Sequence, residues 1–322
     1  MTDLAALEQR LGVLGEHLRR DVPIGPLTTY RVGGPARWFV DVVDAATLSE
    51  LALACAGRGV PVLVVGRGSN LLVADGGFDG LVVQLGDAFA EVTVGSGTRA
   101  DGLTVVRAGG AAALPVVARR TVEAGLTGFE WSVGVPGSIG GAVRMNAGGH
   151  GSDMAASLVE VRVVDLATGE DVVMPRSALQ LNYRSSAIGP SQVVVHADLA
   201  LPAGDREAGA ATLSEIVRWR RANQPGGQNA GSVFTNPAGD SAGRLIDTAG
   251  CRGLRVGTAE VSSKHANFIQ ADAGGSADDI VALMVEVARR VRAAHGVTLH
   301  PETRIVGFAP FADMLATAEG AP

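Results

Sequence analysis

Two glycine-dense segments constrain the fold of this chain more than any other feature of its sequence. The first, Gly66-Arg67-Gly68-Ser69-Asn70, directly follows the hydrophobic segment VPVLVV. The second, residues 134–141, reads GVPGSIGG and carries a glycine at every third position. Glycine allows the backbone to approach a ligand closely, and consecutive N–H groups in such turns can converge on an anion. The pair therefore indicates a backbone that packs against a large, flat ligand carrying phosphates.

Two familiar phosphate-binding motifs do not match these segments. The first segment continues into Leu71 and the strand-like LLV, whereas the dinucleotide-binding fingerprint places a third glycine at the start of a helix. Neither segment ends in Gly-Lys-Ser or Gly-Lys-Thr, so a Walker loop is excluded. An ordinary tight turn remains an alternative for residues 66–70 when they are considered alone.

The composition is that of a folded protein without nucleic-acid-binding character. Of 322 residues, 47% are hydrophobic and 19% are charged, which is sufficient to fill hydrophobic cores. A chain of this length corresponds to two or three domains. The formal net charge is −6, and the chain lacks the basic excess or stripe that nucleic-acid-binding proteins usually show.

The chain also has the features of a protein from a reducing compartment. Its two cysteines, Cys55 and Cys251, lie outside any CxxC motif, which argues against a disulfide framework. The N-terminal segment lacks the apolar core of a signal peptide, and no apolar run approaches the ~20 residues of a membrane helix. None of the six histidines has the paired spacing of metal ligands. We therefore expect a cytoplasmic protein without membrane insertion and without a metal site.

Hydrophobic periodicity predicts an α+β fold. Strand-like segments separated by Gly, Asp and Ala turns occupy residues 80–201 and predict a large, mainly antiparallel sheet. Residues 276–296 predict an amphipathic helix with Ser276 as its N-cap. The C-terminal tail, residues 311–322, is rich in small residues and is expected to fray. Further helices are predicted over residues 5–20, 45–59, 112–125 and 211–225.

Seven motifs then occur in a characteristic order between about Thr28 and Gly307. They are TTYRVGGPA, VVGRGSNLLV, GFEWSVGVPGSIGGAVRMNAG, NYRSS, NAGSVFTNP followed by AGRLID, VSSKHANFI and HPETRIVG. In this order the chain resembles the UDP-N-acetylenolpyruvoylglucosamine reductases, also called UDP-N-acetylmuramate dehydrogenases (the MurB family). The resemblance covers nearly the whole chain.

The resemblance implies an FAD-binding fold of the vanillyl-alcohol-oxidase type in two subdomains, plus a C-terminal α/β substrate-binding domain. The corresponding boundaries are residues 1–80, residues 81–216 joined by the returning segment 299–322, and residues 217–298. No tyrosine lies between Arg184 and the helix near residue 211, whereas part of the family has a tyrosine-bearing loop there. The chain is therefore similar to the shorter type of the family.

The resemblance further implies noncovalent FAD as the cofactor and NADPH as the hydride donor. Relatives that bind flavin covalently use His or Cys near these loops, whereas this chain has Gly-Ser-Asn there. Residues 67–70 are expected to hold the FAD pyrophosphate. The full set of implied cofactor-binding residues is Gly66, Arg67, Gly68, Ser69, Asn70, Leu71, Val135, Pro136, Ser138, Gly140, Gly141 and Asn146.

Three residues match the catalytic residues of the family. The implied reaction reduces the enolpyruvyl C=C of UDP-N-acetylglucosamine enolpyruvate, so negative charge develops on C2 and the carboxylate. Arg184 matches the arginine that stabilises this charge, and Ser232 matches the serine that delivers a proton to C2. Glu302 matches a glutamate beside the same enol. We expect Glu302 to be protonated, or its charge to be offset by Arg184, because a free anion would oppose the reaction.

Substrate contacts are assigned less fully by the resemblance. Tyr183, Asn236, Lys264 and His265 are the implied substrate-binding residues, with Asn236 matching a contact to the diphosphate. The cation that replaces the missing tyrosine is left open among Arg220, Arg221, Lys264 and His265. The nucleotide preference, NADPH or NADH, is also open, and we expect a monomer.

Two other functions remain as alternatives. One is an FAD-dependent oxidase of the same fold that acts on a sugar or a hydroxy acid. The other is a non-catalytic flavin- or nucleotide-binding module. The motifs NAGSVFTNP and HPETRIVG favour the reductase, because an oxidase needs no proton donor for an enolate.

Overall fold

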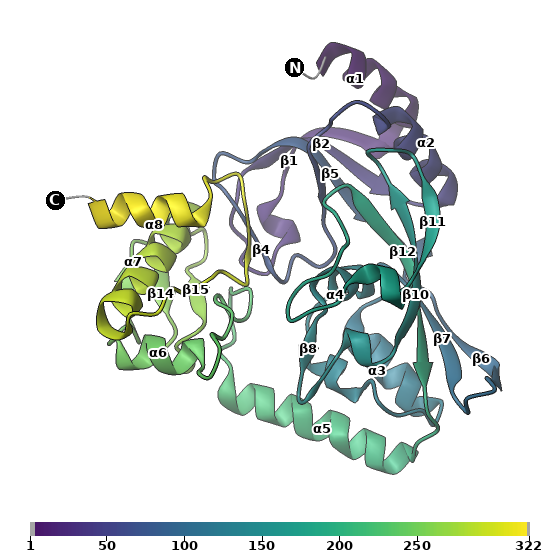
Figure 1. Ribbon diagram of the computed structural model, residues 1–322. Coiled ribbons are helices and arrows are strands. Elements are labelled where there is room, and N and C mark those ends of the chain that lie inside the picture. Colours follow the sequence, from purple (N-terminus) through teal and green to yellow (C-terminus); the bar gives the residue numbers. More distant parts are fainter. Residues whose placement is uncertain (1–3, 321–322) are drawn as a thin grey trace. The chain divides into compact units, whose positions relative to one another are not determined.

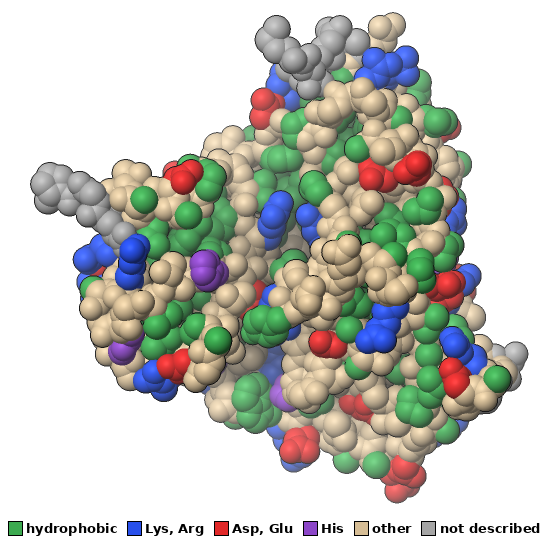
Figure 2. Space-filling model, viewed as in Figure 1, with side chains coloured by type: hydrophobic (Ala, Val, Ile, Leu, Met, Phe, Trp, Pro, Cys, Tyr) green, Lys and Arg blue, Asp and Glu red, His purple; other side chains and the backbone are tan. Residues whose placement is uncertain are grey.

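The computed structural model describes residues 4–320, and the chain divides into two compact units (Figure 1). Each unit is assembled from three separate segments of the chain. Unit 1 comprises Met1–Arg20, Trp38–Arg67 and Gly80–Arg220. Unit 2 comprises Asp21–Arg37, Gly68–Asp79 and Arg221–Pro322. Acidic and basic side chains are intermixed over the face of the molecule drawn in Figure 2.

The N-terminal helix is shorter than its periodicity predicts. Helix α1 spans Leu4–Leu11, a 3-10 segment follows at Gly12–His17, and strand β1 spans Leu18–Pro23. The prediction of one helix over residues 5–20 is therefore wrong. Gly15 has a φ of 53° and leaves the helical region, which glycine does at no steric cost.

A four-stranded sheet follows, with the order β1-β2-β5-β3. Its remaining strands are β2 (Pro35–Val42), β3 (Val62–Val64) and β5 (Phe78–Leu85). Helix α2 (Ala45–Cys55) connects β2 to β3, and its N-cap Asp44 accepts a hydrogen bond from the Thr47 N–H at 2.8 Å. Val40, Val42, Leu81 and Val83 of this sheet are buried against α2 in one core.

The predicted antiparallel sheet is confirmed as a five-stranded sheet with the order β11-β10-β12-β7-β6. All four strand pairs are antiparallel, and helices α3 and α4 pack against the sheet (Figure 1). The bounds are β6 Val92–Thr98, β7 Thr104–Gly109, α3 Leu114–Glu123, α4 Ile139–Met145, β10 Leu158–Asp165, β11 Asp171–Pro175 and β12 Gln192–Leu201.

The remaining elements of unit 1 are a small hairpin, a long helix and several short 3-10 segments. A small hairpin pairs β8 (Gly148–Gly149) with β9 (Ser152–Asp153). Helix α5 (Arg206–Asn223) packs through Ile216 against α3 and against the 3-10 segment Glu130–Gly134. Further 3-10 segments span Gly25–Leu27 in unit 2 and Asp87–Phe89, Met154–Ala156 and Arg176–Leu179 in unit 1.

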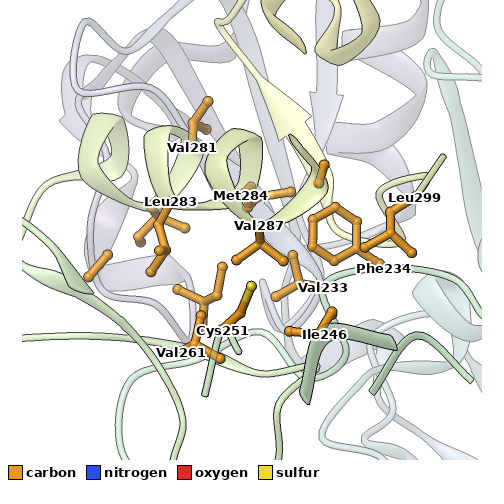
Figure 3. Packing of buried hydrophobic residues seen from close by; sticks show 14 of the residues in the cluster. Val233, Phe234, Ile246, Cys251, Val261, Val281, Leu283, Met284, Val287 and Leu299 are labelled. Atoms are coloured by element: carbon orange, nitrogen blue, oxygen red, sulfur yellow. The ribbon is translucent and has the colours of Figure 1, made fainter. Parts of the chain in front are cut away.

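Unit 2 is built around one apolar core to which all three of its segments contribute. Figure 3 shows Val233, Phe234, Cys251 and Met284 among the side chains of this core. Its elements are β4 Leu71–Val73, α6 Ala242–Thr248, β13 Arg255–Val256, β14 Ala259–Val261, β15 Ile269–Ala271, α7 Ala277–His295, β16 Arg304–Val306 and α8 Phe311–Gly320.

The C-terminal part of unit 2 is more ordered than the sequence predicts. The tail does not fray over residues 311–320, because α8 packs on α7 and buries Leu315; residues 321–322 lie outside the described residues. Strand β16 pairs in parallel with β4, with Arg304 opposite Leu71. This segment belongs to unit 2. The division into three domains, with residues 299–322 returning to residues 81–216, stays a prediction.

Ser276 caps α7 as predicted, and Asp75 reinforces the cap. The Ser276 hydroxyl accepts hydrogen bonds from the N–H groups of Asp278 and Asp279. Asp75, on the loop after β4, accepts from the Ser276 hydroxyl at 2.6 Å and from the Ala277 N–H at 3.0 Å. A carboxylate at a helix N-terminus also interacts favourably with the helix dipole. This contact ties the short segment Gly68–Asp79 to the main body of unit 2.

Candidate functional site

The first glycine loop, residues 66–70, has the backbone that an anion site requires. Gly68 has a φ of +57°, and a Cβ there would collide with the Leu27 carbonyl oxygen and lie 2.6 Å from Thr28 Cα. Only glycine fits this position. Within the part of the chain that the structure describes, the N–H groups of residues 66–70 donate no hydrogen bond to protein. The residues present therefore fit a phosphate group.

Asn70 connects this loop to the segment that carries Glu302. Its side-chain Nδ2 donates to the Glu302 carbonyl oxygen at 3.0 Å. In the opposite direction, the Arg304 N–H donates to the Asn70 carbonyl oxygen, also at 3.0 Å. One predicted cofactor residue and one predicted catalytic residue are thus held together within unit 2.

The second glycine segment is held by the chain itself. The N–H groups of Ile139 and Gly140 donate to the carbonyl oxygens of Ala112 and Gly110, both at 2.9 Å. A Cβ on Gly140 would lie 3.2 Å from the Gly110 carbonyl oxygen. Ser138 is buried, and its hydroxyl lies where a Cβ on Gly66 would be. The glycines here permit close packing of backbone on backbone.

Asn146 holds the turn that follows α4. It adopts a left-handed conformation (φ 39°) as the C-cap of that helix and is buried. Its Nδ2 donates to Asp153 Oδ2 at 3.2 Å and to the Asn182 carbonyl oxygen at 3.0 Å, and its Oδ1 accepts from the Ala155 N–H at 3.0 Å. The amide is therefore fully used within the protein, and its predicted contribution to FAD binding would be to shape the loop.

Arg184 is fixed in unit 1 by the β8–β9 hairpin. It has a positive φ of 56°, which is uncommon for a residue with a side chain and is often found at functional sites. Its Nη2 donates to the Gly148 carbonyl oxygen at 3.1 Å. The guanidinium carbon lies 5.1 Å from the centre of the Tyr183 ring, and that side chain is exposed.

Ser232 and Glu302 lie on two paired segments of unit 2. The Glu302 N–H donates to the Val233 carbonyl oxygen at 2.8 Å, and Phe234 forms a β-bridge with Pro301. The structure thus brings these two predicted catalytic residues together. The third, Arg184, belongs to unit 1.

Asn267 is a supporting residue that the sequence reasoning missed. It is buried, its Oδ1 accepts from the Phe234 N–H at 3.0 Å, and its Nδ2 donates to the Phe234 carbonyl oxygen at 2.8 Å. The Asn267 carbonyl oxygen also accepts from the Val233 N–H at 2.9 Å. Three hydrogen bonds therefore fix the backbone that follows Ser232. The signal in the sequence is an asparagine among the apolar residues of HANFI.

The predicted substrate-binding residues of unit 2 have structural partners. Asn236 Oδ1 accepts from the Ala242 N–H at 3.0 Å, and Lys264 Nζ donates to the Arg221 carbonyl oxygen at 2.5 Å. His265 Nδ1 accepts from the Asn267 N–H at 3.3 Å. Burial, with a smaller effect from Arg252, lowers the pKa of His265 below its ordinary value. His265 is thereby held neutral, which makes it a poor choice for the missing cation.

Arg220, the last residue of unit 1 and close to the C-terminal end of α5, differs from these three residues. Its Cδ lies 3.1 Å from the position that a Cβ on Gly134 would occupy, and burial lowers the pKa of the guanidinium. No carboxylate among residues 4–320 forms an ion pair with it. A partly desolvated arginine without a counter-ion favours an anionic ligand.

Two further properties concern the described residues 4–320 only. They contain no group of three or more His, Cys, Asp or Glu side chains placed to hold a metal ion. They also contain no helix with the length and apolar character needed to cross a membrane.

Comparison with known families matches both parts of the chain. The model of the UDP-N-acetylenolpyruvoylglucosamine reductase C-terminal domain matches residues 223–306, and an FAD-binding domain model matches residues 36–174. The predicted FAD-binding α+β fold is confirmed by these matches and by the structural similarity described next.

Relatives with this name align over nearly the full chain. The UDP-N-acetylenolpyruvoylglucosamine reductase of Acidiphilium cryptum is 43% identical over 307 residues, which is 94% of each chain. That of Synechococcus sp. (strain RCC307) is 40% identical over 297 residues, covering 90% of this chain and 94% of the relative. The crystal structure of UDP-N-acetylenolpyruvylglucosamine reductase (MurB) from Thermus caldophilus superposes with a TM-score of 0.75 at 34% identity. It covers 90% of this chain and 99% of that one. The chain therefore belongs to the UDP-N-acetylenolpyruvoylglucosamine reductase family, as its motifs predicted.

Proposed function

We propose that this chain is an NADPH-dependent flavoenzyme that reduces the enolpyruvyl C=C of UDP-N-acetylglucosamine enolpyruvate to give UDP-N-acetylmuramate, a precursor of peptidoglycan. Membership of the family over 90% or more of the chain supports this activity. The observation that carries the proposal is the hydrogen-bonded group of Asn70, Glu302 and the Ser232 segment, which links a phosphate-fitting loop to the residues that match the family's acid and glutamate.

FAD would be held by the backbone of residues 66–70 and by the second glycine segment. The free N–H groups of the first loop suit its pyrophosphate. When bound, FAD would supply the hydride transfer from NADPH to C3 of the enolpyruvyl group. We propose that FAD is noncovalent, so acid precipitation should release the yellow colour into the supernatant. Colour that stays in the pellet would contradict this part of the proposal.

The protein side chains handle the charge and the proton. Arg184 presents a planar, permanently charged fork that suits the substrate carboxylate as negative charge develops on C2. The Gly148 carbonyl fixes the direction of that fork through its hydrogen bond to Nη2. Ser232 donates the proton to C2, and its position is fixed by the bonds of Asn267 to the next two residues. Glu302 acts in the protonated form or with its charge offset by Arg184.

Arg220 is the best of the four cations considered for the diphosphate. His265 is held neutral by burial, and Lys264 Nζ is bonded to the Arg221 carbonyl oxygen. Arg221 is exposed, whereas Arg220 is partly desolvated. A desolvated guanidinium interacts more strongly with a phosphate than an exposed one.

Separating the two half-reactions of the Ser232→Ala variant tests the proposal. Reduction of the bound FAD by NADPH should stay near the wild-type rate, because it needs no proton at C2. Reoxidation by the enolpyruvyl substrate should slow by roughly 10²–10⁴-fold, the usual contribution of a general acid. Stopped-flow absorbance of the flavin measures both rates, and Ser263→Ala, on an exposed serine of the same unit, is the control. Equal slowing of both half-reactions would remove Ser232 from the proposed role, and a wild-type protein that the substrate does not reoxidise would refute the function.

A cytoplasmic location and a monomeric state are proposed on the sequence alone. Light scattering during size-exclusion chromatography measures the oligomeric state. A mass near 32.7 kDa is expected for the monomer, and twice that mass would contradict it.

A further inference from the structure

We infer that unit 1 carries an aromatic shelf, formed by His150 and Trp219, that stacks the heteroaromatic ring of a nucleotide whose phosphate is held by Arg220. The inference rests on the proposed function, which supplies two ligands of this chemistry besides FAD, a pyridine nucleotide and a uridine diphosphate. It adds His150 and Trp219, which neither the motifs nor the implied site includes.

The two rings of the shelf contact each other at a large angle. The centres of the His150 and Trp219 rings are 5.1 Å apart and the ring planes make an angle of 86°. Trp219 is 47% exposed, whereas the other two tryptophans, Trp38 and Trp131, are 2% and 3% exposed. An edge-to-face contact of this kind fixes the orientation of the two rings relative to each other, and nearly half of Trp219 is exposed to solvent.

The backbone that carries His150 is rigid and strained. His150 occupies the turn of the β8–β9 hairpin with a φ of 50°, a conformation that is uncommon for residues other than glycine and is often found at functional sites. Asn146, two residues before β8, bonds through its side-chain amide to Asp153 at the end of β9 and to the Ala155 N–H beyond it. The imidazole is therefore presented by a fixed turn although its side chain is exposed.

The shelf adjoins the guanidinium group that the proposed chemistry uses. Gly148, whose carbonyl oxygen accepts from Arg184 Nη2 at 3.1 Å, lies two residues before His150 on the same hairpin. A ring bound against His150 would therefore belong to a ligand that extends toward Arg184.

Arg220 supplies the charge that a nucleotide needs. It follows Trp219 on α5, and both its Cδ and the His150 Nε2 lie within 3.6 Å of the position that a Cβ on Gly134 would occupy. The guanidinium is partly buried and has no carboxylate partner among the described residues. An anion would compensate this charge. Two rings beside an uncompensated arginine match a heteroaromatic base attached to a phosphate.

The fluorescence of Trp219 reports ligand binding, because Trp219 is exposed whereas Trp38 and Trp131 are buried. Quenching of its fluorescence by acrylamide is measured on the FAD-loaded protein alone, with NADP⁺, and with UDP-N-acetylglucosamine. Protection by NADP⁺ identifies the pyridine nucleotide as the ligand of the shelf, and protection by UDP-N-acetylglucosamine identifies the uridine nucleotide. Unchanged quenching with both ligands at saturating concentration would overturn the inference, while the activity of the wild-type protein would still decide the proposed function separately.

Substitution tests the energetics of the shelf. Trp219→Ala and His150→Ala should each weaken the Kd of the protecting nucleotide by about fivefold or more, because stacking on an aromatic side chain contributes roughly 1–3 kcal/mol per ring. Arg220→Ala should weaken the same Kd and lower its dependence on ionic strength. Arg218→Ala, on an exposed arginine of the same helix, is the matched control and should leave the Kd unchanged. Wild-type affinity in the Trp219→Ala variant, with FAD still bound, would contradict the shelf.

Discussion

The glycine segment at residues 134–141 in unit 1 and the segment at residues 232–236 in unit 2 are held in position by different means. The glycine segment is fixed by backbone-to-backbone hydrogen bonds, from Ile139 and Gly140 to Ala112 and Gly110. The unit 2 segment is fixed largely by a side chain, since the Asn267 amide bonds both polar backbone groups of Phe234.

This difference determines which substitutions each segment tolerates. Close backbone packing is lost when a Cβ is added, so the unit 1 segment should be sensitive to its glycines. A side-chain bridge is lost when the bridging residue changes, so the unit 2 segment should be sensitive to residues far from it in the sequence. The glycines that hold the unit 1 segment are visible in its own sequence, whereas the residue that holds the unit 2 segment lies elsewhere in the chain.

The largest effect is expected for Asn267→Ala, which tests the side-chain bridge. The variant leaves the buried N–H and C=O of Phe234 without partners, and each unsatisfied buried group costs about 1–3 kcal/mol. The free energy of unfolding of unit 2 should fall by at least that amount, and reoxidation of the flavin by substrate should slow because Ser232 is no longer fixed. Urea unfolding and stopped-flow reoxidation are the measurements.

Gln270→Ala is the control for this experiment. Gln270 Nε2 makes one exposed hydrogen bond, to the Gly226 carbonyl oxygen, so its removal should change stability by about 0.5 kcal/mol or less. If the Asn267→Ala variant were as stable as the Gln270→Ala variant, the unit 2 segment would be held by backbone contacts, and the contrast between the two segments would fail.

A smaller effect is expected for Gly140→Ala, which tests the unit 1 segment. The new Cβ would lie 3.2 Å from the Gly110 carbonyl oxygen, closer than ordinary contact. Such overpacking costs about 1–3 kcal/mol, and the better helix propensity of alanine in α4 offsets roughly 0.5–1 kcal/mol of it. Thermal unfolding of the apoprotein should show a net loss. Gly141→Ala is the matched control, because its Cβ would lie 3.7 Å from Ser138 Oγ and meet nothing closer. If the Gly140→Ala variant were as stable as the Gly141→Ala variant, the backbone around Gly110 would be able to shift and accommodate the added Cβ.

Local patterns predicted the parts of the fold that local contacts determine. The five-stranded sheet consists of antiparallel strands that short apolar segments between turn residues predicted, and α7 has a Ser276 cap followed by an amphipathic repeat. Both signals lie within a few residues of the element they predict. The prediction of a helix over residues 5–20 was wrong because hydrophobic periodicity does not detect a residue, here Gly15, whose backbone leaves the helical region.

Long-range pairings were outside the reach of such patterns. Nothing near Arg304 in the sequence reports that β16 lies beside Leu71 of β4, and nothing near Ser232 reports that Asn267 fixes the following residues. The candidate site residues came instead from ordered motifs and their resemblance to a family. The structure added the supporting contacts of Asn70, Asn146 and Asn267. The role of each side-chain amide follows from its hydrogen-bond partners, which the sequence does not give.

The smallest effect is expected from pH, through the one titratable side chain that bonds to Asn267. Burial lowers the pKa of His265 below its ordinary value of 6.5, so the unfolded chain binds a proton there more readily than the folded chain. Stability from this group is therefore fully present above about pH 6.5 and is lost as the pH falls through the lower folded-state pKa. Protonation also removes the Nδ1 lone pair that accepts from the Asn267 N–H at 3.3 Å. His265→Asn keeps an acceptor oxygen without a titrating ring, so its unfolding free energy should fall less between pH 7 and pH 5 than that of the wild type. His196, in unit 1, also has a pKa lowered mainly by burial and titrates equally in both proteins, so the difference between them isolates His265. Parallel pH profiles for the two proteins would show that this hydrogen bond does not contribute to holding Asn267 and the Ser232 segment.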